Sequence, residues 1–80
     1  MEIEVVAFGI AKDIINGKQV TISLGADQTV GAARKQLSDT FPEFTKLSSL
    51  RFAVNADYVE DGYPLKAGDE VVLIPPVSGG

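Results

Sequence analysis

One long amphipathic helix pattern, set among short strand patterns, constrains the fold of this chain most. Four apolar residues recur at spacings of three and four and form one stripe of a helix: Val30, Ala33, Leu37 and Phe41. The polar side of that helix carries Arg34, Lys35, Ser38 and Asp39. Asp27 or Thr29 can cap its N-terminus, and Pro42 ends it, because a residue before proline resists helical dihedral angles. A single helix of this kind can cover only one face of a sheet.

Alternating apolar and polar residues predict five strands around the helix. The expected strands span residues 2–8, 19–24, 50–54, 58–59 and 70–74. Two short helical turns are expected as well, at 12–15, closed by Gly17, and at 64–67. This order predicts an α+β fold, the ubiquitin-like β-grasp, with a mixed sheet, the first and last strands parallel in its middle and an open second face. We expect residues 1–74 to form this domain and residues 75–80 to form a protruding, extended Gly-Gly tail.

Composition removes several classes of chemistry. The 80 residues, 45% of them hydrophobic, suffice for one small core. No Cys or His is present, which excludes disulfides, thiolate catalysis and sulfur-ligated metals and removes the usual neutral-pH base. A net charge of −4 argues against nucleic-acid binding and suits a basic protein partner.

The sequence also lacks the signals of a membrane or secreted protein. No apolar run approaches the roughly 20 residues that span a bilayer. The start Met1-Glu2-Ile3-Glu4 has no basic region typical of a signal peptide. We therefore expect a cytoplasmic protein.

The C-terminal segment is the strongest functional signal. The last strand pattern runs into Pro75 and Pro76, which end ladder pairing and favour an extended backbone, and then through Val77 and Ser78 to Gly79-Gly80. Two glycines without side chains can thread a narrow channel. The α-carboxylate of Gly80 is an anion at neutral pH and can attack the α-phosphate of ATP. The alternative is a frayed chain end without function.

A second candidate site is the uncovered face of the sheet. If Ile3, Val5 and Ala7 face the helix, Val6 and Phe8 point the other way. The strand at 70–74 is apolar on both faces too, so an apolar docking patch is expected beside the tail. The alternative is that loops cover this face. Five acidic residues in neighbouring turns are interpreted mainly as solvated surface: Asp57, Glu60, Asp61, Asp69 and Glu70.

The C-terminal sequence resembles that of a known family. Residues 64–80 read Pro-Leu-Lys-Ala-Gly-Asp-Glu-Val-Val-Leu-Ile-Pro-Pro-Val-Ser-Gly-Gly, which is similar to the end of the MoaD/ThiS sulfur-carrier family. The segment Phe-Ala-Val-Asn at 52–55, Thr29-Val30 and the overall length also match, so the resemblance covers essentially the whole chain. It is strongest toward the branch of small, sulfur-carrier subunits of molybdopterin synthase. Gly31-Ala32 departs from the pattern, because a larger apolar residue is expected there.

The resemblance implies a carrier that is not an enzyme on its own and binds no cofactor. A ubiquitin-activating-like adenylyltransferase would adenylate Gly80 with ATP and Mg²⁺, and a persulfide sulfurtransferase would convert the adenylate to a thiocarboxylate. The carrier would then dock on the large, catalytic subunit of molybdopterin synthase, in a heterotetramer of two small and two large subunits. There it would give its sulfur to cyclic pyranopterin monophosphate. Gly79 would keep the passage into that site open.

The resemblance also assigns partner contacts and leaves alternatives. Phe8 and Ile74 match apolar docking positions, and the partner-binding segment continues through Pro75, Pro76, Val77 and Ser78. A carrier for thiamine-thiazole synthesis is the nearest alternative. A protein modifier joined to lysines through Gly80 is another, and an interaction module with an inert tail is a third.

Overall fold

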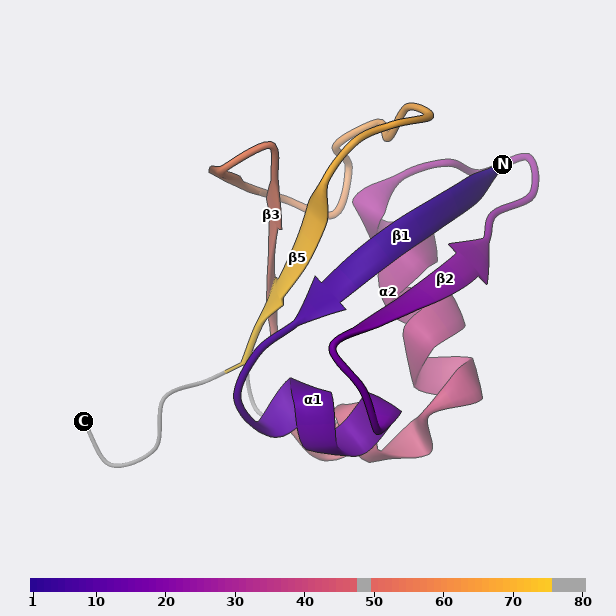
Figure 1. Cartoon of the computed structure of the whole chain (residues 1–80). Coiled ribbons are helices and arrows are strands. Elements are labelled where there is room, and N and C mark those ends of the chain that lie inside the picture. The colour runs from indigo at the N-terminus through magenta and orange to yellow at the C-terminus, as the bar shows by residue number, and fades with distance from the viewer. Residues whose placement is uncertain (48–49, 76–80) are drawn as a thin grey trace.

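The structure is a computed structural model that describes residues 1–47 and 50–75 (Figure 1). Its strands are β1 (Glu2–Ala7), β2 (Gln19–Ser23), β3 (Arg51–Val54), β4 (Asp57–Val59) and β5 (Val71–Ile74). Its helices are α1 (Ile10–Ile15), α2 (Val30–Thr40) and a 3₁₀ helix, η1 (Pro42–Lys46). No helix in the described part of the chain is both long and apolar enough to cross a membrane.

The strands form one mixed sheet in the order β2-β1-β5-β3-β4. β1 and β5 are parallel neighbours, with Val5 opposite Val71 and Ala7 opposite Leu73, and all other pairs are antiparallel. α2 lies against one face of the sheet (Figure 1). This confirms the predicted α+β, ubiquitin-like β-grasp with its first and last strands side by side in the middle.

The core lies between α2 and the inward face of the sheet. β1 and β5 alternate as predicted, since Ile3, Val5 and Ala7 are buried, as are Val71 and Leu73. The helix stripe is confirmed for Val30, Ala33 and Leu37, all fully buried. Its fourth member, Phe41, is only half-buried because α2 ends at Thr40, and its ring packs edge-on against Phe44 of η1 at 6.0 Å.

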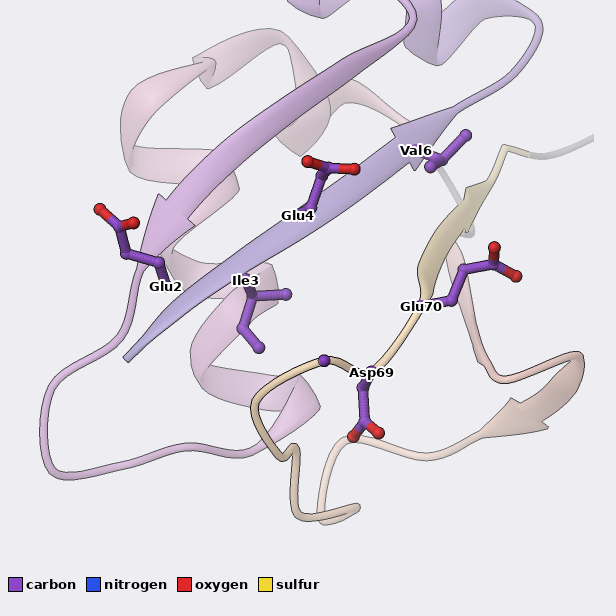
Figure 2. Close-up of a pocket in the computed structure, with 7 residues that line it drawn as sticks. Glu2, Ile3, Glu4, Val6, Asp69 and Glu70 are labelled. Atoms are coloured by element: carbon purple, nitrogen blue, oxygen red, sulfur yellow. The ribbon is translucent and has the colours of Figure 1, made fainter.

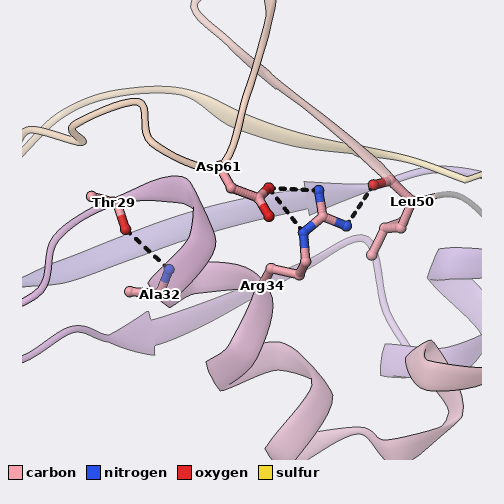
Figure 3. A network of polar contacts seen from close by, with 5 residues as sticks. All are labelled: Thr29, Ala32, Arg34, Leu50 and Asp61. Atoms are coloured by element: carbon pink, nitrogen blue, oxygen red, sulfur yellow. Dashed lines mark hydrogen bonds and ion pairs between the residues drawn. The ribbon is translucent and has the colours of Figure 1, made fainter.

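The N-terminus of α2 is capped by both predicted residues in series. Thr29 Oγ1 accepts a hydrogen bond from the Ala32 N–H at 3.2 Å (Figure 3). Asp27 Oδ1 in turn accepts from the Thr29 hydroxyl at 2.8 Å and from the Thr29 N–H at 3.2 Å. These bonds satisfy donors that a helix start leaves without intrahelical partners.

Arg34 differs from its predicted place on the wet side of the helix. It is half-buried, and its Nη1 donates to the Leu50 carbonyl at 2.7 Å while Nη2 lies 3.0 Å from Asp61 Oδ1 (Figure 3). The guanidinium carbon also lies 5.0 Å from the Phe52 ring centroid. Arg34 therefore ties α2 to the start of β3 and to the loop around Asp61.

The contact between α2 and the loop around Asp61 also explains why residue 31 is glycine. Its N–H donates to the Asp61 carbonyl at 2.8 Å, and a Cβ at this position would lie 3.2 Å from that oxygen. A larger side chain would push the loop away from α2. The departure from the family pattern at this position is thus explained by close packing of the loop.

The two predicted helical turns are corrected. At 12–15, the helix begins earlier, at Ile10, and ends at Asn16 in the left-handed conformation (φ 59°), so Asn16 rather than Gly17 closes it. The turn at 64–67 is not helical. Its backbone pairs instead with the segment before α2, since Pro64 forms a β-bridge with Thr29 and the Leu65 N–H donates to the Gln28 carbonyl at 2.7 Å.

Candidate functional site

The end of β5 lies against the turn that follows β1. Because the two strands are parallel and Ala7 lies opposite Leu73, Phe8 and Ile74 occupy the next positions at the same end of the sheet. Gly9 adopts φ 55° and ψ −134°, a backbone conformation that residues with a Cβ rarely adopt. A Cβ on Gly9 would lie 3.5 Å from Pro75 Cγ, so the turn and Pro75 are in close contact. The chain thus leaves the sheet beside Phe8.

The remaining predicted site residues follow this exit point. Pro76, Val77, Ser78, Gly79 and Gly80 lie outside the residues that the structure describes. Their roles, and the division of the chain into 1–74 and a tail of 75–80, therefore stay predictions. Pro75, the first residue of the predicted tail, is half-buried.

The open face of the sheet carries an apolar row next to the exit. Strand register aligns Val6 with Val72, Val72 with Ala53, and Ala53 with Tyr58 across four strands. Val6, Val72 and Ile74 are half-buried, whereas Phe8 is 55% exposed and Tyr58 is 62% exposed. Continued by one residue, the β1–β5 register places Phe8 next to Ile74, and among residues 1–47 and 50–75 this mostly apolar surface is partly exposed. We call Val6, Phe8, Val72 and Ile74 the exit patch.

Sequence reasoning missed Arg51 and Tyr58 at the edge of this patch. Arg51 lies opposite Ile74 in the β3–β5 register, and its guanidinium carbon lies 4.9 Å from the centroid of the Tyr58 ring. The alternation of residues 50–54 around buried Phe52 and Val54 could have placed Arg51 on the open face. Its neighbours could not be foreseen, because they depend on strand register.

The opposite end of the open face is acidic. Figure 2 shows a depression lined by residues of β1 and of the segment before β5: Glu2, Ile3, Glu4, Val6, Gly68, Asp69 and Glu70. Within residues 1–47 and 50–75, no three acidic side chains are placed to hold a metal ion. Val6 lines this depression and also belongs to the exit patch, so the acidic residues adjoin the apolar ones along β1.

Two of the predicted surface acids also have structural partners. Asp61 pairs with Arg34, and Asp69 accepts the Lys66 N–H at 2.8 Å and the Asn55 side-chain amide at 3.1 Å. The backbone hydrogen bond from Lys66, followed by that from the Asn55 amide, lowers the pKa of Asp69 below its ordinary value. These bonds fix the turn that leads into β5.

Comparisons with known proteins support one family. The sequence profile of the ThiS family matches residues 5–80. The chain is 32% identical over 83 residues to the molybdopterin synthase sulfur carrier subunit of Chlamydomonas reinhardtii, covering 100% of both chains. It is 31% identical over 83 residues to the subunit of the same name from Homo sapiens, covering 99% of this chain and 94% of that one.

Solved structures agree with the fold. SAMP1 from Haloferax volcanii superposes with a TM-score of 0.84 at 26% identity, over 100% of both chains. A chain in the complex of subunits 1 and 2 of the molybdopterin-converting factor from Helicobacter pylori superposes at 0.69 with 28% identity, also over 100% of both chains. The Caldiarchaeum subterraneum ubiquitin, at 24% identity and a TM-score of 0.65, shares the fold.

The match reaches the last residue of the chain, and the relatives align with it along its whole length. On this evidence the chain belongs to the ThiS family of sulfur carriers and is related throughout to the sulfur carrier subunits of molybdopterin synthase.

Proposed function

We propose that this protein carries sulfur for molybdopterin synthesis on the carboxyl carbon of Gly80. The full-length relationship to molybdopterin synthase sulfur carrier subunits supports this most directly. The ending Pro75-Pro76-Val77-Ser78-Gly79-Gly80 supplies a carboxylate without a neighbouring side chain. The folded domain contributes the point from which this segment leaves, at Pro75.

The chemistry begins with activation of the carboxylate. A carboxylate oxygen of Gly80 attacks the α-phosphorus of ATP on a ubiquitin-activating-like adenylyltransferase, with Mg²⁺, and pyrophosphate leaves. The terminal sulfur of a persulfide on a sulfurtransferase then attacks the acyl carbon and displaces AMP. A thiol cleaves the resulting acyl disulfide and releases the thiocarboxylate. The sequence has neither Cys nor His, so these partner enzymes supply the thiols.

The carrier that bears the thiocarboxylate then docks on the large subunit of molybdopterin synthase. The exit patch is the surface for this contact, because it is apolar, partly exposed among the described residues and adjacent to the point where the tail leaves. Gly79 lets the tail enter the large subunit, where the thiocarboxylate gives its sulfur to cyclic pyranopterin monophosphate. The Helicobacter pylori relative, solved with subunit 2 of its converting factor, supports such a partner. We expect a heterotetramer of two small and two large subunits, in the cytoplasm.

The mass of the carrier tests the proposal. After co-expression with its adenylyltransferase and sulfurtransferase, we expect intact-mass spectrometry to show one oxygen replaced by sulfur at Gly80. A chain that lacks Gly80 should keep its thermal melt and gain no sulfur, because the deletion leaves the core intact. An unchanged mass of the wild-type chain would contradict the proposal, and a lost melt in the deletion variant would make the tail structural.

Two alternatives have distinct outcomes in the same experiments. The similarity to SAMP1, which a second structure names small archaeal modifier protein 1, favours a modifier as second candidate. A modifier would appear as adducts on lysines of other proteins. A carrier for thiazole synthesis would form the same thiocarboxylate but would not convert cyclic pyranopterin monophosphate when mixed with the large subunit.

A further inference from the structure

Arg51 places a positive charge at the border of the exit patch. It is exposed, lies opposite Ile74 in the β3–β5 register and stacks on Tyr58. The contact favours this position of the guanidinium above the sheet, since cation and aromatic face attract each other. The charge is thus part of the surface that a partner on the exit patch would meet.

No acidic group in the described part of the chain forms an ion pair with Arg51. Across residues 1–47 and 50–75, the ion pair found is that of Arg34 with Asp61. Glu2, Glu4 and Glu70 lie toward the end of the face where β5 begins, whereas Arg51 lies opposite Ile74, where β5 ends. Glu60, which follows Val59 in the register that pairs Val59 with Phe52, is the acidic residue nearest to Arg51 in the strand pairing, and it forms no ion pair with Arg51. The exit end of the face therefore offers a cation and apolar side chains together.

The cation of Arg51 beside apolar side chains determines which partner surface can cover the exit patch. A partner that removes Ile74 and Phe8 from water also removes much of the water around Arg51. A charge buried without a partner is costly, whereas a matched carboxylate compensates for the lost hydration. Guanidinium groups also bind carboxylates through two parallel hydrogen bonds, which fixes orientation.

We propose that the surface of the large subunit that covers the exit patch presents an aspartate or glutamate to Arg51. This rests on the proposed function, which makes the large subunit the occupant. The pair would orient the docked carrier, so that its tail faces the large subunit's active site. It would also reject partners whose surface is apolar or basic at that point.

Replacing Arg51 with leucine separates this idea from simple apolar docking. In Arg51→Leu the partner carboxylate loses its counter-ion, and we expect the affinity for the large subunit of the same organism to fall about tenfold to hundredfold. If the opposing surface is apolar instead, the added leucine makes the patch more apolar and tightens binding. Unchanged or tighter binding of Arg51→Leu would overturn the proposal.

Matched variants make the result specific. Lys35 is exposed on α2, the helix against the other face of the sheet, so Lys35→Leu removes the same charge and should bind like wild type. Arg51→Lys should retain more affinity than Arg51→Leu, since it keeps the charge. Equal losses of affinity in Lys35→Leu and Arg51→Leu would mean that only the net charge of the carrier matters, and would overturn the proposed ion pair. Titration calorimetry gives the affinities, and thermal melts check folding.

Failure of the proposed function has a different signature. In that case the wild-type carrier itself fails to bind the large subunit or to acquire sulfur, and the proposed ion pair of Arg51 is wrong as well. If the wild-type carrier binds the large subunit and acquires sulfur, and Arg51→Leu binds the large subunit as tightly, only the proposed ion pair with Arg51 is wrong.

Discussion

Among individual residues, Ala56 has the backbone conformation least suited to its side chain. Asn55 (φ 51°) and Ala56 (φ 76°) form the two-residue turn between β3 and β4, in which Val54 lies opposite Asp57. Positive φ at both positions is the turn that Asn-Gly fits best. Asn55 also has polar contacts, since its amide donates to Asp69 and its side-chain oxygen accepts the Glu70 N–H at 3.0 Å. Ala56 has no side-chain hydrogen bonds to compensate, and its left-handed backbone brings its Cβ too close to the following carbonyl oxygen.

We therefore expect Ala56→Gly to raise the free energy of unfolding by about 0.5–1 kcal/mol, the left-handed strain minus the added flexibility of glycine. Asn55→Gly is the matched control. It also suits the turn but loses two hydrogen bonds, so it should lower stability by about 1 kcal/mol. Urea denaturation measures both. A lower stability of Ala56→Gly would mean that the turn does not require positive φ at this position.

At the scale of elements, Arg34 links three segments that are distant in the sequence. Its partners Leu50 and Asp61 are 16 and 27 residues away. The period of α2 predicted the buried stripe from the sequence, because spacing alone decides which residues share a helix face. The anchoring role of Arg34 and the extended backbone at 64–67 could not be predicted in this way. Both depend on which loop the sheet topology brings against the start of α2.

Replacing either partner of this anchor should have unequal effects. Arg34→Met leaves the partly buried Leu50 carbonyl without its donor, and we expect a loss of about 1–2 kcal/mol in the free energy of unfolding. Asp61→Asn removes only an exposed ion pair and keeps an oxygen acceptor, so the loss should stay below about 1 kcal/mol. Chemical denaturation of both variants measures the difference. A larger loss in Asp61→Asn would show that the ion pair, not the carbonyl contact, is the anchor.

For the whole molecule, the sequence predicted the sheet and the location of the exit patch but not its charged border. β1 and β5 are apolar on both faces near the exit, so their central, parallel placement and the exposure of Phe8 followed from the residues. The assignment of Gly80 depended on the terminal motif, which carries its own chemistry. Arg51 and Tyr58 come from strands whose register the sequence does not encode locally.

Phe8→Asp tests the exit patch as a docking surface. Phe8 is 55% exposed, so the substitution should change stability by less than about 0.5 kcal/mol. It should weaken binding to the large subunit at least about tenfold, because it places a charge in an apolar interface. Ile10→Asp is the control, since Ile10 is similarly exposed, at 48%, but belongs to α1. Equal weakening by both variants in calorimetry would mean that the contact is not confined to the exit patch.

The position of β5 has a consequence for biosynthesis. The strand lies between β1 and β3, yet it follows every other strand in the chain. A nascent chain that stops before residue 71 would leave two strands with bare edges and no bridge between them. Folding must therefore wait until the ribosome has made the strand that leads directly into the C-terminal segment. Products that end before residue 71 would remain open to proteolysis, so they would not accumulate as folded chains that bind a partner without bringing sulfur.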